Sequence, residues 1–175
     1  MSVVLDEMKT RRSIRKFKPD MVPADVLDQI IEAGTFAANG RGLQSPIIIA
    51  VTNKEMRDKI MEMNRMIGGW EEGFDPFYGA PVILIVLADA SCPTAVYDGS
   101  LTMGNLMLAA HDLGIGSCWI HRAKEEFESD WGRNLLRSLG VNGDYEGIGH
   151  CALGYADGDY PAAPARNEGR VFYVK

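Results

Sequence analysis

The sequence has few cysteines, no surplus of basic residues and no long hydrophobic run. The three cysteines, Cys92, Cys118 and Cys151, are odd in number and form no CxxC pair. This argues against a disulfide framework and favours a reducing compartment. The simplest interpretation is three buried thiols, since free cysteine is among the most buried residue types.

The charge balance gives no general attraction to nucleic acid, because the formal net charge is −6 at pH 7 and the only short basic cluster lies near Arg11. We therefore expect no nucleic-acid partner. The longest apolar run, residues 80–88, is too short to cross a bilayer, and acidic residues follow the N-terminus before a signal-like segment develops. These features predict a soluble, unexported, cytoplasmic protein without a membrane partner.

A chain of 175 residues with 46% hydrophobic residues fits a single domain spanning 1–175. Hydrophobic periodicity predicts helices over residues 4–10, 23–36, 54–67 and 97–113, and a further helix from a Ser129 cap to a point before Gly140. Strands are predicted over 46–52, 81–89, 115–121 and 145–154. Because its run 47–51 is apolar throughout, we expect the strand 46–52 to be central in its sheet. The sum is an α+β or α/β sandwich with helices on both faces of the sheet.

Two segments lack a regular period. Residues 68–79 combine glycine, proline and aromatic side chains, which indicates a loop that either covers a flat ligand or packs its rings on its own domain. Beyond Ala156 the chain is too rich in proline, glycine and alanine for regular structure, yet residues 171–174 have the composition of a strand. Either a swapped tail that pairs with another subunit or a frayed terminus explains this ending.

A basic cluster follows the first predicted helix. In an extended stretch Arg11, Ser13 and Arg15 project from the same side, so two guanidinium groups and a hydroxyl can converge on one anion. Guanidinium forks bind phosphate oxygens in bidentate fashion, which makes a phosphate group the natural ligand. A merely solvated basic surface is the alternative.

The segment 37–46 joins a predicted helix directly to a predicted strand. Its glycines, Gly40 and Gly42, let backbone approach a ligand closely, and Asn39, Arg41 and Gln44 can donate hydrogen bonds. Such loops at the ends of sheets commonly bind ligands, although a plain turn would have the same composition.

Other chemistries are disfavoured. Cys118, His121, His150 and Cys151 superficially suggest a zinc site, but residues three apart on a strand face opposite sides and no HExxH or CxxC motif is present. We expect no metal. No nucleophile elbow or triad pattern surrounds Ser117, and the glycines after residue 113 lack the third glycine of a dinucleotide fingerprint.

Several motifs in order resemble the nitroreductase-like flavoproteins. They are an Arg-Arg-Ser-x-Arg-x-Phe stretch from Arg11, a proline-led helix, an alanine-rich loop ending in Leu-Gln-x-Pro, a buried strand, a long helix opened by Asp98, and Gly-Ile-Gly-Ser-Cys-Trp-Ile from Gly114. The similarity runs from about Met8 to Arg170. It implies an α+β fold with a central mixed or antiparallel sheet flanked by helices on both faces, in a domain-swapped homodimer whose tail, residues 156–175, reaches the partner subunit.

The resemblance also implies FMN bound non-covalently between two subunits. Arg11 and Ser13 match positions that hold the FMN phosphate, and Arg12 lies beside them. Arg15 matches a basic residue near flavin N1 and the C2 carbonyl. Arg166 resembles the tail residue that returns to the phosphate, with Arg170 as the alternative.

Further positions are implied at the ring. From the second subunit, the loop with Ala38, Asn39, Gly40 and Gln44 lines the flavin. His121 and Arg122 match residues whose backbone lies at flavin N5 and O4.

The sequence departs from the family pattern at three places. Gly42 and Pro46 replace an asparagine and a tryptophan that the family loop often has, and His121-Arg122 replaces a glycine or glutamate followed by a small residue. We therefore expect individual loop contacts to differ from those of the family, and the His121 or Arg122 side chain to narrow or charge the substrate pocket.

The function implied is hydride transfer from NAD(P)H, through FMN, to a nitroaromatic, quinone or similar electron-poor acceptor by a ping-pong route. The cofactor carries the bond-making chemistry, so no side chain is assigned as an acid or base. Two alternatives stay open: a flavin-binding protein that stores or senses FMN without turnover, and a specialised flavin reductase of one metabolite.

Overall fold

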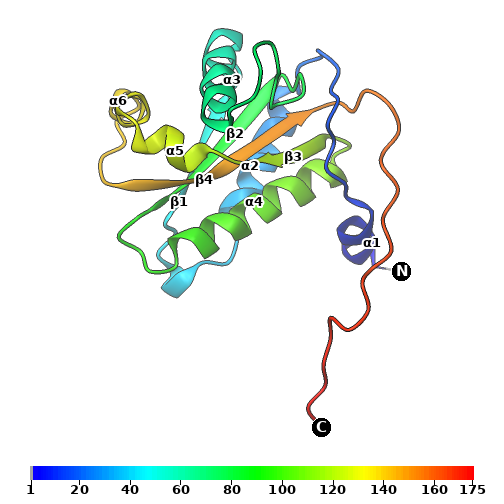
Figure 1. The fold of residues 1–175 in the computed structure, drawn as a ribbon. Helices are drawn as coiled ribbons and strands as arrows, with labels where there is room; N and C mark the ends of the chain where they lie inside the picture. The colour runs from blue at the N-terminus through cyan, green and yellow to red at the C-terminus, as the bar shows by residue number, and fades with distance from the viewer. Residues whose placement is uncertain (1) are drawn as a thin grey trace.

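The computed structural model describes residues 2–175 and contains one antiparallel sheet of four strands in the order β1-β2-β4-β3 (Figure 1). The strands are β1 (Pro46–Val51), β2 (Val82–Asp89), β3 (Gly116–Ile120) and β4 (Tyr145–Gly154). All neighbouring pairs are antiparallel. The expected α+β architecture and the four predicted strands are thus confirmed.

Strand β2 is the centre of the sheet, and residues 82–88 are fully buried. It pairs with β1 on one side and β4 on the other. The prediction that β1 is central is wrong, because β1 pairs only with β2 and forms an edge. An apolar run indicates that other elements cover both faces of a strand. It does not show whether the strand has a neighbour in the sheet on one side or on both.

Helices cover both faces of the sheet, as predicted (Figure 1). One hydrophobic cluster joins Ile83 and Ile85 to α3 (Lys54–Gly68), α5 (Ala123–Glu128) and α6 (Asp130–Ser138). The other joins Leu84 and Val86 to α2 (Ala24–Thr35) and α4 (Ala95–Asp112). Alternate residues of β2 therefore face the two layers, as the pleat requires.

Local signals account for several helix ends. The Asn53 side chain accepts from Met56 N–H at 2.9 Å at the start of α3, and the predicted Ser129 cap accepts from Gly132 N–H at 3.2 Å at the start of α6. Gly114 follows α4 with φ +73°, the left-handed conformation expected of a helix-ending glycine. Helix α5 was not predicted, because its six residues are mostly charged and show no clear period.

The segment after α1 (Val3–Thr10) runs along β3 and carries the basic cluster with it. Ser13 bridges Ser117 in parallel, and Ile14 N–H donates to the Ser117 carbonyl at 2.9 Å. Ile14 and Phe17 are buried in the core, so the segment is firmly attached.

The tail beyond Ala156 is irregular, as predicted, and leaves the sheet (Figure 1). Tyr160 lies 5.6 Å from His111, ring to ring, and His111 also hydrogen-bonds Thr10 of α1 at 2.9 Å. Residues 171–174 are exposed and form no strand in the single chain, since a strand needs a hydrogen-bonded neighbour. Their pairing with another subunit stays a prediction. None of the helices among residues 2–175 combines the length and the hydropathy of a membrane-spanning segment.

Candidate functional site

The structure brings Arg11, Ser13 and Arg15 together around one side chain of β3, the buried Cys118. Burial raises the pKa of the Cys118 thiol, and the Arg15 charge, the Ser13 side chain and the Arg11 charge oppose that rise. Groups that act on one sulfur atom lie close to one another. The three side chains thus lie in the neighbourhood of one sulfur atom, and their convergence on one anion stays a prediction.

Arg11 has donor capacity that the protein leaves unused. Its Nη1 is buried without a hydrogen-bond partner among residues 2–175, as is the Ser117 hydroxyl on β3. Buried polar groups are normally satisfied, so such atoms call for an explanation. A phosphate oxygen beside Arg11 would supply the missing acceptor.

Arg12 has a different role from its neighbours in this structure. Its guanidinium donates to the carbonyl groups of Lys9, at 2.5 Å, and Arg11. A cation at the last turn of a helix satisfies free carbonyls and complements the helix dipole. Arg12 thus caps α1 and fixes the direction in which the basic segment leaves it.

The loop 37–45 is held on the start of α4 by Asp98, a residue whose anchoring role the sequence did not reveal. The buried Asp98 carboxylate accepts from Gly40 N–H at 2.9 Å, and from the hydroxyl groups of Ser45 at 3.0 Å and Thr94 at 2.9 Å. Within the loop, Asn39 Oδ1 accepts from Gln44 N–H at 2.8 Å. The sequence signal that could have indicated this role is an aspartate in the first turn of an otherwise apolar helix.

This loop is tightly fitted and partly strained. A Cβ atom at Gly40, in the short 3-10 helix η1 (Gly40–Gly42), would lie 2.2 Å from the Thr94 hydroxyl oxygen, so only glycine fits. Arg41 and Gln44 have φ values of 56° and 51°, which is uncommon for residues other than glycine. Such strain is concentrated at functional sites. Ala38 is exposed beside these residues.

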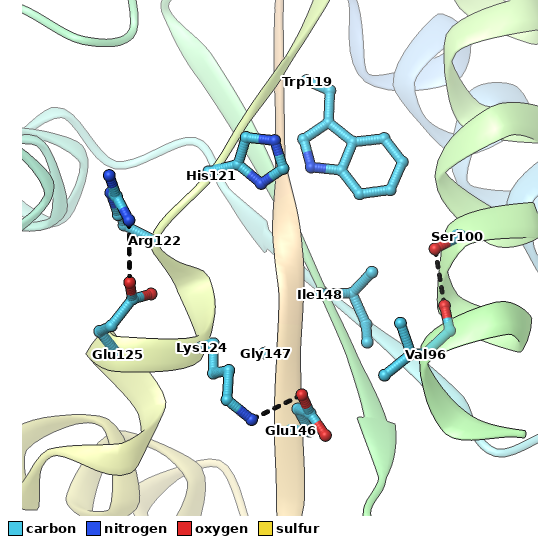
Figure 2. Close-up of a pocket in the computed structure, with 10 residues that line it drawn as sticks. All are labelled: Val96, Ser100, Trp119, His121, Arg122, Lys124, Glu125, Glu146, Gly147 and Ile148. Atoms are coloured by element: carbon cyan, nitrogen blue, oxygen red, sulfur yellow. Dashed lines mark hydrogen bonds and ion pairs between the residues drawn. The ribbon is translucent and has the colours of Figure 1, made fainter. Parts of the chain in front are cut away.

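His121 and Arg122 follow the end of β3 and lie at the edge of a cavity of about 600 Å³ (Figure 2). The rings of Trp119 and His121 lie 6.0 Å apart, and Arg122 pairs with Glu125 at 3.1 Å. The lining residues come from α4, β3, α5 and β4; they are Val96, Ser100, Trp119, His121, Arg122, Lys124, Glu125, Glu146, Gly147 and Ile148. Since Asp98 and Thr94 begin the same helix as Val96, the loop 37–45 and this cavity border one end of α4.

Arg166 lies in the exposed tail, where its guanidinium donates to the Pro164 carbonyl at 2.6 and 3.2 Å. Its predicted approach to the phosphate position stays a prediction.

The sequence also did not predict a buried polar network that lies under the His121–Arg122 turn. It consists of Asn64, Glu126 and His150, all fully buried. Asn64 follows Ile60 by four residues and so lies on the apolar stripe of α3, which was the one sequence signal available. Glu126 and His150 meet only because α5 packs on β4.

Comparison with known proteins gives a family match and similar solved structures. A model of the Nitroreductase family matches residues 8–155. A protein of Methanothermobacter thermautotrophicus, provisionally named NADH dehydrogenase/NAD(P)H nitroreductase, is 35% identical over 125 residues, which is 66% of this chain and 59% of the relative. This chain thus spans less than two thirds of that relative's length.

Two solved structures match along the whole chain. A nitroreductase with bound FMN from Bacteroides fragilis has a TM-score of 0.91 and 29% identity, with 100% of both chains covered. A nitroreductase with bound FMN from Desulfitobacterium hafniense has a TM-score of 0.89 and 26% identity, again with 100% of both chains covered.

Proposed function

The chain belongs to the nitroreductase family, and on that premise we propose that it is an FMN-dependent oxidoreductase. In this proposal it transfers hydride from NAD(P)H to a nitroaromatic, quinone or similar electron-poor acceptor by a ping-pong route. The observation that carries the proposal is the cluster of Arg11, Ser13 and Arg15 around Cys118, with a buried guanidinium nitrogen that has no acceptor among residues 2–175.

The basic cluster fits the phosphate end of FMN. Arg11 and Ser13 would hold the phosphate, because one supplies a charged fork and the other a hydroxyl donor. Arg15 is exposed next to them and would place its charge near the N1 edge of the ring. Arg166 would join the phosphate from the tail.

The other end of β3 fits the ring end of the cofactor. There the backbone of His121 and Arg122 would meet the N5 and O4 edge, beside the cavity of about 600 Å³. That volume lies within the range of small-molecule pockets, which is roughly 300–1,000 Å³. The cavity would admit the nicotinamide and the acceptor in turn.

We also propose a homodimer in which residues 38–40 and Gln44 of one subunit line the flavin of the other, and the tail 156–175 crosses to the partner. Large apolar side chains are exposed on the loop, on α4 and in the tail: Phe36 at 79%, Leu43 at 56%, Tyr97 at 71% and Phe172 at 85%. Exposed apolar surface of this extent is typical of an interaction site.

When bound, FMN supplies a ring that takes up a hydride from one substrate and gives it to the next. The protein's own part is to hold the phosphate, to orient the ring edge against the His121–Arg122 turn and to keep a positive charge nearby. Electrostatic groups fixed in place before the reaction need no reorganisation when charge develops.

The function is tested by anaerobic absorption spectroscopy of the FMN-loaded protein. We expect NADH or NADPH to bleach the flavin band rapidly and a nitroaromatic or quinone to restore it. A flavin band that stays unchanged after addition of both nicotinamides would instead indicate FMN storage or sensing. Restoration by a single metabolite from a screen would indicate the specialised reductase.

A further inference from the structure

We propose that Asn64 is a positioning residue for the cofactor face of the site. It holds the His121 carbonyl so that the N–H of Arg122 faces the FMN ring edge. This inference rests on the proposed function and adds to it a residue of α3 that lies behind the turn.

Asn64 is fully buried and uses both hydrogens of its side-chain amide. Its Nδ2 donates to the His121 carbonyl at 2.7 Å and to Glu126 Oε1 at 3.0 Å. An amide nitrogen has two N–H donors, so both are committed. One side chain of α3 thereby connects the end of β3 to α5.

Contacts with Glu126, and through it with His150, fix the orientation of the Asn64 side chain. Glu126 Oε2 lies 2.7 Å from His150 Nε2, and both of these side chains are fully buried. Because Glu126 accepts with one oxygen from Asn64 and contacts His150 with the other, neither side chain can rotate without losing a buried contact. Asn64 Oδ1 and His150 Nδ1 already lack a partner among residues 2–175. Because each further uncompensated buried polar group is costly, a rotation that broke the remaining contacts is disfavoured.

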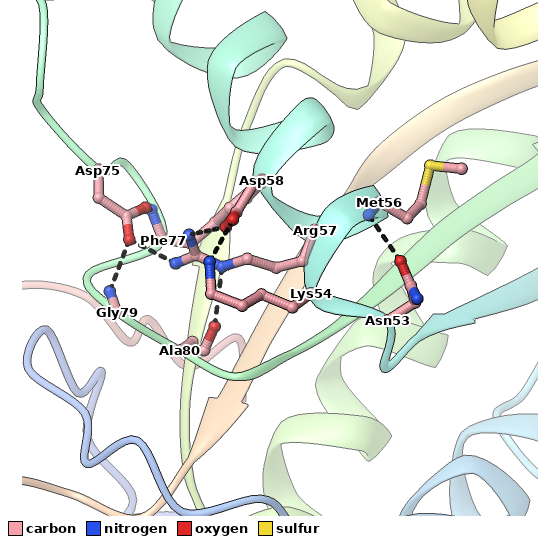
Figure 3. Close-up of polar contacts among 9 residues, drawn as sticks. All are labelled: Asn53, Lys54, Met56, Arg57, Asp58, Asp75, Phe77, Gly79 and Ala80. Atoms are coloured by element: carbon pink, nitrogen blue, oxygen red, sulfur yellow. Dashed lines mark hydrogen bonds and ion pairs between the residues drawn. The ribbon is translucent and has the colours of Figure 1, made fainter.

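The His150 end of the network is packed against a loop that is itself held in place. The Phe77 ring lies 5.3 Å from the His150 ring, and the Phe77 loop is clamped by the buried Arg57 (Figure 3). Arg57 donates to the Ala80 carbonyl at 3.1 Å and pairs with Asp75, whose carboxylate also accepts from the N–H groups of Phe77 and Gly79. The aromatic loop thus packs Phe77 on its own domain, behind His150.

The peptide between His121 and Arg122 is trans, like every peptide bond of the described chain. In a trans peptide the carbonyl and the N–H point in opposite directions. Because the His121 carbonyl points inward to Asn64, the Arg122 N–H points away from the buried network. No hydrogen bond among residues 2–175 uses that N–H, so it is a free donor on the proposed cofactor side.

The carbonyl of Arg122 is held as well. It accepts from Glu126 N–H at 3.0 Å, at the start of α5. Arg122 has φ +85° and ψ 1°, a left-handed conformation that a non-glycine residue adopts only when its surroundings impose it. Asn64 and the first turn of α5 together impose it here.

The test is the hydrogen exchange of the Arg122 amide, measured by NMR with and without FMN. In the parent protein, FMN should slow this exchange by about tenfold or more, the effect of one added hydrogen bond. In Asn64→Leu, which keeps the number and branching of side-chain heavy atoms and removes both donors, FMN should change the exchange of this amide by less than about threefold. Oxidised FMN should also bind more weakly in that variant.

A matched control is Ile60→Ala, one turn earlier on the same buried stripe of α3. It removes apolar contacts and leaves the turn untouched, so FMN should protect Arg122 as in the parent. Glu126→Gln should also retain protection, because the glutamine oxygen accepts from Asn64. Asn64→Asp is the second variant if Asn64→Leu does not fold. Its carboxyl shares a proton with Glu126 and leaves none for the His121 carbonyl, so protection should again be lost.

Undiminished FMN-dependent protection of Arg122 in either Asn64 variant overturns the proposal, as does equal loss of protection in Ile60→Ala. Failure of the parent protein to bind FMN at all would instead count against the proposed function. The two failures are therefore distinguishable in one set of samples.

Discussion

Gly40 and Asp98 are 58 positions apart in the chain, yet the Gly40 N–H donates a 2.9 Å hydrogen bond to the Asp98 carboxylate. The same carboxylate receives the hydroxyl groups of Ser45 and Thr94. One buried acid on α4 thus fixes the loop proposed to line the flavin at two points, Gly40 and Ser45.

Asp98→Ala should destabilise the fold by roughly 2–4 kcal/mol, because it removes a charged acceptor and leaves three donors without a partner. Urea unfolding followed by circular dichroism measures this. Asp112→Ala, at an exposed position near the end of the same helix, should stay within about 0.5 kcal/mol of the parent. Equal losses of unfolding free energy in the two variants would show that Asp98 does not anchor the loop.

The cysteines should alkylate in the order Cys92, Cys118, Cys151. Burial raises the pKa of both the Cys118 and Cys151 thiols, and the Arg15 and Arg11 charges and the Ser13 side chain partly offset this at Cys118. A raised pKa lowers the thiolate fraction at a given pH, and the thiolate is the nucleophile.

Cys118 labelling should therefore rise only at a pH above the usual thiol range, whereas the half-buried Cys92 should react first. Mass spectrometry of iodoacetamide-treated protein at several pH values gives the rates. Labelling of Cys118 as fast as Cys92 in the folded protein would refute the assigned order.

Arg15→Gln should lower the flavin midpoint potential, because a positive charge near N1 stabilises the negative charge of the reduced ring. About 1–3 kcal/mol of attraction in a partly solvated pocket corresponds to roughly 20–65 mV for a two-electron couple. Arg11→Gln should weaken FMN retention without an equal change of potential. Potentiometry with excess FMN measures the midpoint potential of both variants. A shift of this potential in Arg11→Gln but not in Arg15→Gln would mean that Arg11 lies near the ring and Arg15 near the phosphate.

The tail should be required for a dimer. Light scattering of the FMN-loaded protein at micromolar concentration should give twice the chain mass, and removal of residues 156–175 should reduce it. Obligate interfaces bury about 2,000 Å² or more, which an exposed apolar tail helps to supply. A monomeric parent that still binds FMN contradicts the swapped dimer.

Most of the fold could be predicted from local pattern. The strand at 145–154 matches β4 residue for residue, and the Ser129 cap and Gly114 end lie where predicted. The edge position of β1 could not be predicted, because strand neighbours are chosen by long-range pairing. Helix α5 begins directly after left-handed Arg122, whose side chain makes no capping hydrogen bond, so its start is imposed by the tertiary structure.

The candidate site was predictable where its residues are close in sequence. Arg11, Ser13 and Arg15 lie on one extended segment, so their alternation was enough to group them, and their role towards a phosphate stays a prediction. The Asn64–Glu126–His150 network was not predictable, because its members come from α3, α5 and β4 and none carries a motif. The same holds for Asp98, whose partners lie in a loop more than fifty positions away.

The central claim is that this chain holds FMN, and a spectral titration of the purified protein with FMN tests it most directly. The account predicts saturable binding of one FMN per chain, with a shifted flavin band and weakened binding in Arg11→Gln. A flavin spectrum that stays that of free FMN at saturating protein would contradict it.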